Sequence, residues 1–159
     1  MTKNITNTKL VLVMTLVSKN SDYAIRALMA LAQNPGRGFV SSSALAGADG
    51  IPLRFLRRIL RDLLRAKMIE AKEGVRGGVR LARRPEKITL ANVIQLFQGP
   101  VQLSRCMFRS QLCGNRGSCV LRRRIQDIEA LVSQEFQGIT IAGLCQDQQR
   151  GGKRGAHEA

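Results

Sequence analysis

The chain of 159 residues contains no tryptophan, one tyrosine and one histidine, and these shortages exclude several classes of protein. Aromatic side chains make up only 4% of the residues, so the chain lacks a set of rings on which unpaired RNA bases would stack. The one histidine, His157, lies close to the C-terminal end, and no nucleophile–base pair or phosphate loop stands out elsewhere. We therefore expect that the protein is not an enzyme.

A long hydrophobic segment is also missing. The most apolar stretch, residues 9–17, is too short to span a bilayer, and no small-x-small cleavage pattern follows it. Four cysteines, three of them clustered, fit a reducing compartment better than a secreted disulfide fold. These features predict a cytoplasmic protein without a membrane partner. We further expect residues 1–15 to be an N-terminal extension, with Met14 as the functional start.

Acidic residues are scarce, with 11 Asp and Glu against 26 Lys and Arg, which gives a formal net charge of +15. So large an imbalance implies an anionic partner, with nucleic acid as the first candidate and a membrane surface as the second. Arginine greatly outnumbers lysine, and its forked guanidinium suits phosphates and guanine edges better than diffuse attraction to lipid.

Two short segments predict a helix-turn-helix. Serines 41–43 precede a short helical run at 44–48, and a second helix is expected from Pro52 to about Lys67. The second helix has apolar residues at spacings of three and four, and its other face carries arginines with Asp62 as the sole acid. A solvated face is the alternative, but like charges repel unless an anion relieves them, so we favour DNA recognition. The DNA-contacting residues that we expect are Ser42, Ser43, Arg54, Arg57, Arg58, Arg61 and Arg76.

A hairpin is predicted directly after this helix. Residues 68–72 and 79–82 read as strands joined by a Gly-rich turn, which places Arg76 at the tip of a wing. A plain hairpin with a basic tip is the alternative. Two further helices are expected at 23–33, capped by Ser21 or Asp22, and at 90–98, capped by Thr89. The predicted fold class is mainly α with a small β-hairpin wing, that is, a winged helix-turn-helix with a long dimerisation helix.

Three cysteines, Cys106, Cys113 and Cys119, lie in one short Gly- and Ser-containing stretch. No pair has the CxxC spacing of a zinc ribbon or a thioredoxin-like site, but a tight loop would let three thiolates converge on one soft metal or cluster. Three inert buried thiols are the alternative. Cys145 is expected to be a small buried hydrophobe and not a ligand.

The segment from Cys119 to about Gln137 predicts a long helix with an apolar seam. The seam packs onto its own domain or pairs with a second copy, and pairing agrees with the two half-sites that helix-turn-helix proteins usually read. We therefore expect a homodimer, whose interface residues are Leu121, Ile125, Ile128 and Val132.

Four segments in this order resemble the IscR/NsrR-type family of bacterial iron–sulfur winged-helix regulators: residues 21–28, 51–56 and 77–81, and the three-cysteine loop. The resemblance implies a homodimer joined through the long helix, a bound iron–sulfur cluster, and DNA affinity that depends on that cluster. The wing departs from the family, because Glu73 and Val79 stand where an arginine and an aromatic residue are frequent.

The resemblance also implies the metal ligands. The IscR-like branch has a histidine three residues after the last cysteine, where this chain has Arg122, whereas the NsrR-like branch uses a carboxylate near the start of the first helix, supplied by the other subunit. Asp22 occupies that position. The implied ligands of a [4Fe-4S] or [2Fe-2S] cluster are Cys106, Cys113, Cys119 and Asp22.

The function that we expect is transcription regulation by binding to a double-stranded DNA operator, controlled by a cluster that senses nitric oxide, oxygen or iron–sulfur status. The alternative is a basic RNA- or ribosome-associated protein with a structural zinc. The expected organisation is an extension at 1–15, a DNA-binding domain at 16–100, a cluster loop at 101–119, a dimerisation helix with a C-terminal element at 120–145 and a disordered basic tail at 146–159.

Overall fold

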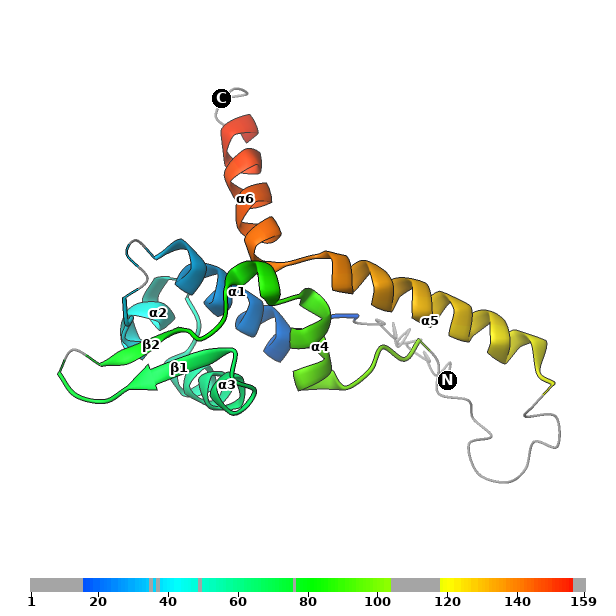
Figure 1. Cartoon of the computed structure of the whole chain (residues 1–159), viewed down its shortest axis with the longest axis horizontal. Helices are drawn as coiled ribbons and strands as arrows, with labels where there is room; N and C mark the ends of the chain where they lie inside the picture. The colour runs from blue at the N-terminus through cyan, green and yellow to red at the C-terminus, as the bar shows by residue number, and fades with distance from the viewer. Residues whose placement is uncertain are drawn as a thin grey trace, which may run out of the picture.

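A computed structural model describes residues 16–34, 36, 38–48, 50–75, 77–103 and 118–155 of the chain. The described elements are α1 (Lys19–Gln33), α2 (Ser42–Ala48), α3 (Leu53–Arg65), β1 (Ile69–Lys72), β2 (Gly78–Leu81), the 3-10 helix η2 (Pro85–Lys87), α4 (Leu90–Gln98), α5 (Val120–Gly138) and α6 (Ile141–Gly155). Helices α1 to α4 and the hairpin form one body, from which α5 and α6 extend in different directions (Figure 1). The predicted fold class, mainly α with a hairpin wing, is confirmed.

An aliphatic core holds this body together. Its fully buried side chains come from α1, α3, β1, α4 and α6, and include Leu28, Leu56, Leu63, Val93 and Ile141. Helices α1 and α3 contribute buried residues at spacings of three and four, which is the pattern of a helix that buries one face. Burial of this apolar surface fixes α3 against α1 and leaves the opposite face of α3 in solvent.

Helix α1 begins earlier than the sequence indicated. Its N-cap is Ser18, whose hydroxyl accepts a hydrogen bond from the backbone N–H of Ser21. The expectation that Ser21 or Asp22 caps this helix is therefore wrong. Ser21 is instead fully buried, and its hydroxyl donates to Oε1 of Gln98 at 2.7 Å, a contact across 77 residues that local sequence does not reveal.

Helix α4 begins with the predicted cap. The hydroxyl of Thr89 accepts from the backbone N–H of Asn92, and the amide oxygen of Asn92 accepts from the backbone N–H of Thr89. This reciprocal pair is a capping box, which satisfies two donors that the first turn of a helix leaves free.

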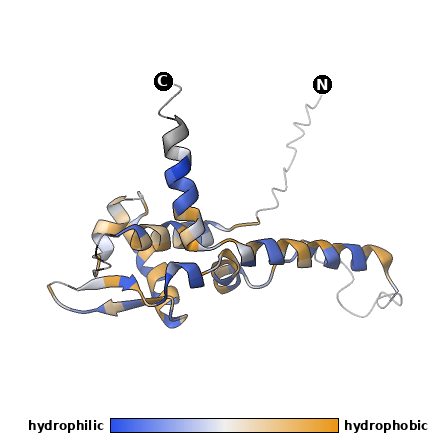
Figure 2. Ribbon diagram, turned by 45° about the horizontal axis from the view of Figure 1, so that its top comes forward, coloured by the Kyte–Doolittle hydropathy of each residue, from blue (hydrophilic) through white to orange (hydrophobic). Residues whose placement is uncertain are grey.

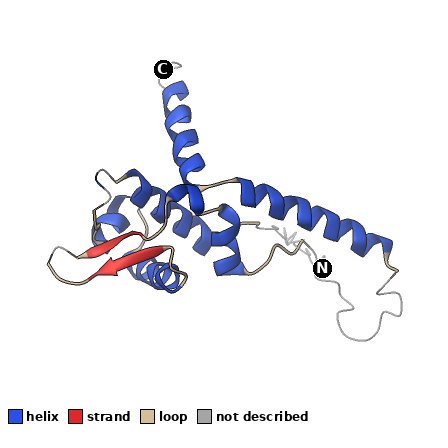
Figure 3. Cartoon of the chain, in the orientation of Figure 1, coloured by secondary structure: helices blue, strands red, loops and turns tan. Residues whose placement is uncertain are grey.

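The two strands pair antiparallel, with Ile69 opposite Leu81 and Lys72 opposite Gly78 (Figure 3). Val40, in the segment before α2, adds a bridge to Val79 through two backbone hydrogen bonds of 2.9 Å. A Cβ at Gly78 would lie 2.3 Å from the carbonyl oxygen of Val40, and the φ of Gly78 is +153°. Only glycine lets the wing approach the helix-turn-helix so closely.

Helix α6 runs through Gly155, so the expectation of a disordered tail from residue 146 onward differs from the structure. Ile141 and Cys145 are buried against the body, and Nε2 of Gln33 on α1 donates to Oε1 of Gln148 at 2.9 Å. These anchors, together with the good helix propensity of glutamine, extend a helix into a polar segment. Within the described ranges, no helix is long and apolar enough to cross a membrane.

Candidate nucleic-acid interface and metal site

Helix α3 divides into a buried face and a basic face. Leu56, Ile59, Leu60 and Leu63 are buried, whereas every arginine of the helix is exposed. The exposed set consists of Arg54, Arg57, Arg58, Arg61 and Arg65. Within the part of the chain that the structure describes, Arg65 is the one member with an ion pair, 3.8 Å from Asp62. The positive charge of this face is thus largely uncompensated by ion pairs with the described residues.

The start of α2 carries the two serines that are predicted to contact DNA. Ser41, one of the three serines that precede the helix, accepts a hydrogen bond from the backbone N–H of Ala44 and so caps α2. The hydroxyls of Ser41 and Ser43 are 3.1 Å apart, Ser43 is exposed and Ser42 is half-buried. Of the two serines predicted to contact DNA, Ser43 is therefore the more exposed.

The wing, which consists of β1 and β2, also carries basic residues. Arg76, the predicted tip residue, lies outside the described residues. The guanidinium of Arg80 lies 4.6 Å from the ring centre of Phe39 and pairs with Glu70, and the ammonium of Lys72 lies 6.0 Å from the same ring. Cation–π contacts of this kind attach the hairpin to the segment before α2.

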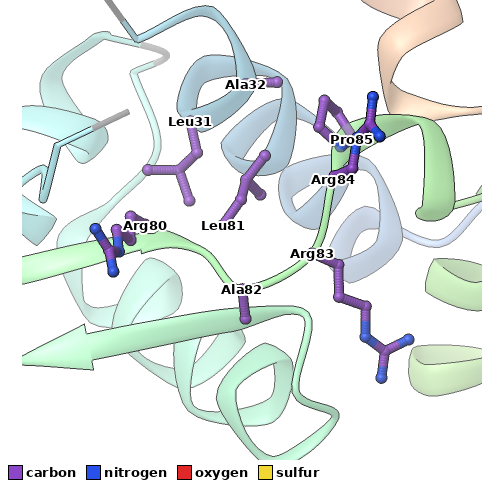
Figure 4. Close-up of a pocket in the computed structure, with 8 residues that line it drawn as sticks. All are labelled: Leu31, Ala32, Arg80, Leu81, Ala82, Arg83, Arg84 and Pro85. Atoms are coloured by element: carbon purple, nitrogen blue, oxygen red, sulfur yellow. The ribbon is translucent and has the colours of Figure 1, made fainter. Parts of the chain in front are cut away.

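Arg83 is a basic residue that the sequence reasoning missed. Its guanidinium donates to the backbone carbonyl of Ala66, just past the end of α3, at 3.1 Å. The adjacent pair Arg83–Arg84 was the available signal. A pocket of about 200 Å³ opens nearby between α1 and the β2–η2 segment. Figure 4 shows the Arg83 side chain directed away from the apolar residues Leu31 and Leu81, so its charge does not converge on that pocket.

Of the four predicted metal ligands, Cys106 and Cys113 lie outside the described residues. Cys119 is the N-cap of α5, is half-buried and forms no disulfide. Asp22 lies on α1, with 43% of its side chain exposed, and pairs with Arg26 at 3.1 Å. No three His, Cys, Asp or Glu residues of the described ranges come together to hold a metal ion.

Both ends of the cysteine segment meet α5. The backbone N–H of Leu103 donates to Oε1 of Glu129 at 2.8 Å, and Cys119 begins the helix ten residues earlier, about 15 Å away along its axis. Leu103 and Cys119, which flank the segment, are therefore both attached to α5. Thiolate donors suit iron–sulfur iron, and Asp22 is accessible, so the donor chemistry of these residues fits such a group.

Cys145 is buried, with 8% of its surface exposed, as expected for a small hydrophobe. Its thiol lies 3.8 Å from the carbonyl oxygen of Met29. Burial raises the pKa of this thiol, and a hydrogen bond with Gln33 offsets part of the rise. A thiol held in its neutral form is a poor metal ligand.

The predicted seam on α5 divides into two parts. Leu121 and Ile128 are 69% and 51% exposed, whereas Ile125 and Val132 are half-buried. Val120 and Leu131 are exposed as well and were not predicted. Apolar colour recurs along the whole of α5, which extends from the body (Figure 2). A single chain leaves a contiguous apolar surface of this helix in water.

Comparison with known proteins decides the family. Residues 17–147 match the profile of the Rrf2 family, described as an iron-dependent transcriptional regulator. The chain belongs to the Rrf2 family. The resemblance drawn from the motifs is thereby confirmed, as is the prediction of a DNA-binding transcription regulator that is not an enzyme.

Individual relatives agree with this assignment. The chain is 32% identical over 129 residues to Protein aau3 of Rhizobium meliloti, covering 80% of this chain and 83% of the relative. It is 27% identical over 125 residues to the HTH-type transcriptional regulator NsrR of Shouchella clausii, covering 78% and 84%.

Solved structures share the Rrf2 fold. T. potens IscR aligns with a TM-score of 0.69 at 22% identity, over 87% of this chain and 91% of that one. CymR, the global cysteine regulator of B. subtilis, aligns with a TM-score of 0.67 at 21% identity, over 84% and 98%.

Proposed function

We propose that this Rrf2 regulator binds its operator as a homodimer and that an iron–sulfur cluster held by the cysteine loop controls its affinity. The observation that carries the DNA-binding part is the row of exposed arginines on α3, four of which have no ion pair among the described residues. Helix α3 is the second helix of the helix-turn-helix, the position that enters the major groove. Ser42, Ser43 and the wing residue Arg76 complete the proposed contacts with DNA.

The homodimer rests on α5. Its exposed apolar side chains, Leu121, Ile128 and Leu131, would lose contact with water when two copies of the helix pair. Ile125 and Val132, which are already half-buried, would form the inner edge of that interface. Pairing would also place two copies of α3 at a fixed separation, as two half-sites require.

The cluster part rests on donor chemistry. Cys106, Cys113 and Cys119 supply three thiolates, and Asp22 of the other subunit is the proposed fourth ligand. When bound, the cluster would supply an iron centre that reacts with oxygen or nitric oxide. The name NsrR of one relative and the name IscR of a structural neighbour agree with this proposal. Asp22 does not cap α1, and among the described residues its proposed ligand role competes with its exposed ion pair with Arg26.

Control of DNA binding follows from how the elements connect. Glu129 holds the start of the cysteine segment to α5, Gln98 ties the end of α4 to Ser18 and Ser21 at the start of α1, and α1 packs on α3. A change in the arrangement of the cysteine loop on cluster binding would therefore be transmitted through α4 and α1 to α3, the helix that is proposed to read the bases. Such a coupling is a difference in stability between two arrangements.

The test uses the full chain purified without oxygen. The wild type should be brown and contain iron, Cys119→Ser should lose both properties, and operator affinity measured by fluorescence anisotropy should differ between the two proteins. Asp22→Asn should retain the fold but lose its colour faster in air. Cys145→Ser is the control, and it should keep the spectrum. A colourless wild type that contains zinc would overturn the cluster proposal, and an Asp22→Asn variant that bleaches like the wild type would remove Asp22 from the ligand set.

A further inference from the structure

The first turns of α3 expose arginines and one aromatic ring, and no other base-reading side chain. The exposed residues are Arg54, Phe55, Arg57, Arg58 and Arg61. The helix has no Asn, Gln or Glu, and its one acid, Asp62, lies near Arg65. Each side-chain type recognises particular base edges, so this restricted set limits the sequences that α3 can read.

Phe55 is the unusual member of this set. It is 53% exposed and does not belong to the hydrophobic core, although it lies in a helix whose neighbouring residues Leu56 and Ile59 are almost fully buried. Its ring stands one turn before Arg58 and on the flank of the arginine row. Among the described residues, Phe55 is neither in the hydrophobic core nor among the partly buried side chains that pack against it.

Two kinds of base edge match this surface. Arginine donates two parallel hydrogen bonds to O6 and N7 of guanine, and an apolar side chain packs against the C5-methyl group of thymine. Adenine is read by Asn or Gln and cytosine by an acid, and α3 offers neither at an exposed position. The N-terminal residues of a recognition helix are those that reach base edges, so Arg54, Phe55 and Arg58 are placed to read and Arg65 to contact the backbone.

We propose that α3 reads a half-site that combines guanine, recognised by Arg54 and Arg58, with a thymine whose methyl group packs on the ring of Phe55. The proposal rests on the proposed entry of α3 into the major groove and adds the bases that it selects. Phe55 is then a specificity-determining residue and Arg54 and Arg58 are its guanine-reading neighbours.

The first experiment selects binding sites from a random-sequence duplex library with the full-length protein. Guanine and thymine should be enriched within each half-site. In the best site, thymine is then replaced by deoxyuridine, which removes only the methyl group and should weaken binding about fourfold. Replacing guanine by 7-deazaguanine, which removes only the N7 acceptor, should weaken binding about fivefold.

Variants assign these effects to residues. Phe55→Ala should bind the thymine and deoxyuridine duplexes equally, and Phe55→Leu should keep part of the preference and serves where the alanine variant is unstable. Leu64→Ala is the matched control, because Leu64 is also an exposed apolar residue of α3, 41% exposed, but lies in its last turn. It should keep the full thymine preference.

The outcomes separate this inference from the function on which it rests. A protein that binds no duplex at all contradicts the proposed function. A protein that selects a site but binds deoxyuridine as well as thymine, or keeps the preference in Phe55→Ala, overturns the role of Phe55. In that case the exposed ring faces another macromolecule, such as a protein partner.

Discussion

At the scale of single residues, Gly78 is a position where the wing leaves no room for a side chain. Gly78→Ala should destabilise the protein by about 1–3 kcal/mol, because the new Cβ would lie 2.3 Å from the carbonyl oxygen of Val40 and the backbone φ of +153° disfavours any side chain. Urea unfolding followed by circular dichroism measures the change. The variant should also bind operator DNA more weakly, since the hairpin would have to move away from Val40.

Gly47 provides the matched control for this substitution. It lies within α2, where an added Cβ would meet nothing within 4 Å. Gly47→Ala should therefore leave stability unchanged or raise it by about 0.5–1 kcal/mol, since alanine restricts the unfolded chain and favours a helix. Equal losses in both variants would show that the contact with Val40 is not the cause.

At the scale of secondary-structure elements, Gln98 joins α4 to α1. Its Oε1 accepts from the backbone N–H of Ser18 and from the buried hydroxyl of Ser21, both at 2.7 Å, and its Nε2 donates to the carbonyl of Leu16. Gln98→Met keeps the length of the side chain but leaves the hydroxyl of Ser21 without this acceptor. We expect a loss of about 1–3 kcal/mol in the free energy of unfolding.

Gln95 lies one turn earlier on α4 and is exposed, so Gln95→Met tests the substitution itself. It should change the free energy of unfolding by less than about 0.5 kcal/mol. If the two variants unfold at the same urea concentration, the tie between α4 and α1 contributes nothing to stability.

The contact between Ser21 and Gln98 illustrates why some parts of the fold could be predicted from the sequence and others could not. Helix α3, the hairpin and α4 were predicted within a residue or two, because periodicity and local caps define them. The predicted cap of α1 was wrong, because Ser18 caps the helix and Ser21 is buried against Gln98, 77 residues away. The length of α6 was also missed, since its anchors Ile141, Cys145 and Gln148 lie against α1 and the segment before α4 and not within a local pattern.

Helix α5 carries the next prediction at this scale. Ile128→Asp should yield a monomer that retains its helical circular dichroism, because Ile128 is 51% exposed in one chain and a charge there disturbs only a paired surface. Light scattering measures the change, and operator binding should weaken with it. Gln126→Asp, on an exposed polar position of the same helix, is the control and should leave the dimer intact. An Ile128→Asp variant of unchanged mass would place the interface elsewhere.

At the scale of the whole molecule, the net charge and the family indicate the same kind of partner. The individual site residues, in contrast, were inferred from motifs. The net charge of +15 predicted an anionic partner, and membership in a family of DNA-binding regulators agrees with it. Individual contacts were harder to predict. Arg83 was missed because its position beside the end of α3 depends on how the hairpin folds back, which brings its guanidinium to the carbonyl of Ala66.

Because Arg83 lies beside the end of α3, we expect it to contact a DNA phosphate and to contribute to the salt dependence of DNA affinity. A side chain that contacts phosphate releases counterions on binding, so the logarithm of the affinity falls with the logarithm of salt concentration by about 0.9 per contact. Arg83→Ala should reduce this slope by about 1 and weaken binding to all sequences alike, whereas Arg58→Ala should also flatten the preference among bases. Anisotropy titrations at several salt concentrations measure both. Arg150→Ala removes the same charge from α6, which extends away from α3 (Figure 1), and should leave the slope unchanged. A slope that falls equally for Arg83→Ala and Arg150→Ala would mean that DNA responds to the total charge and not to a basic surface around α3.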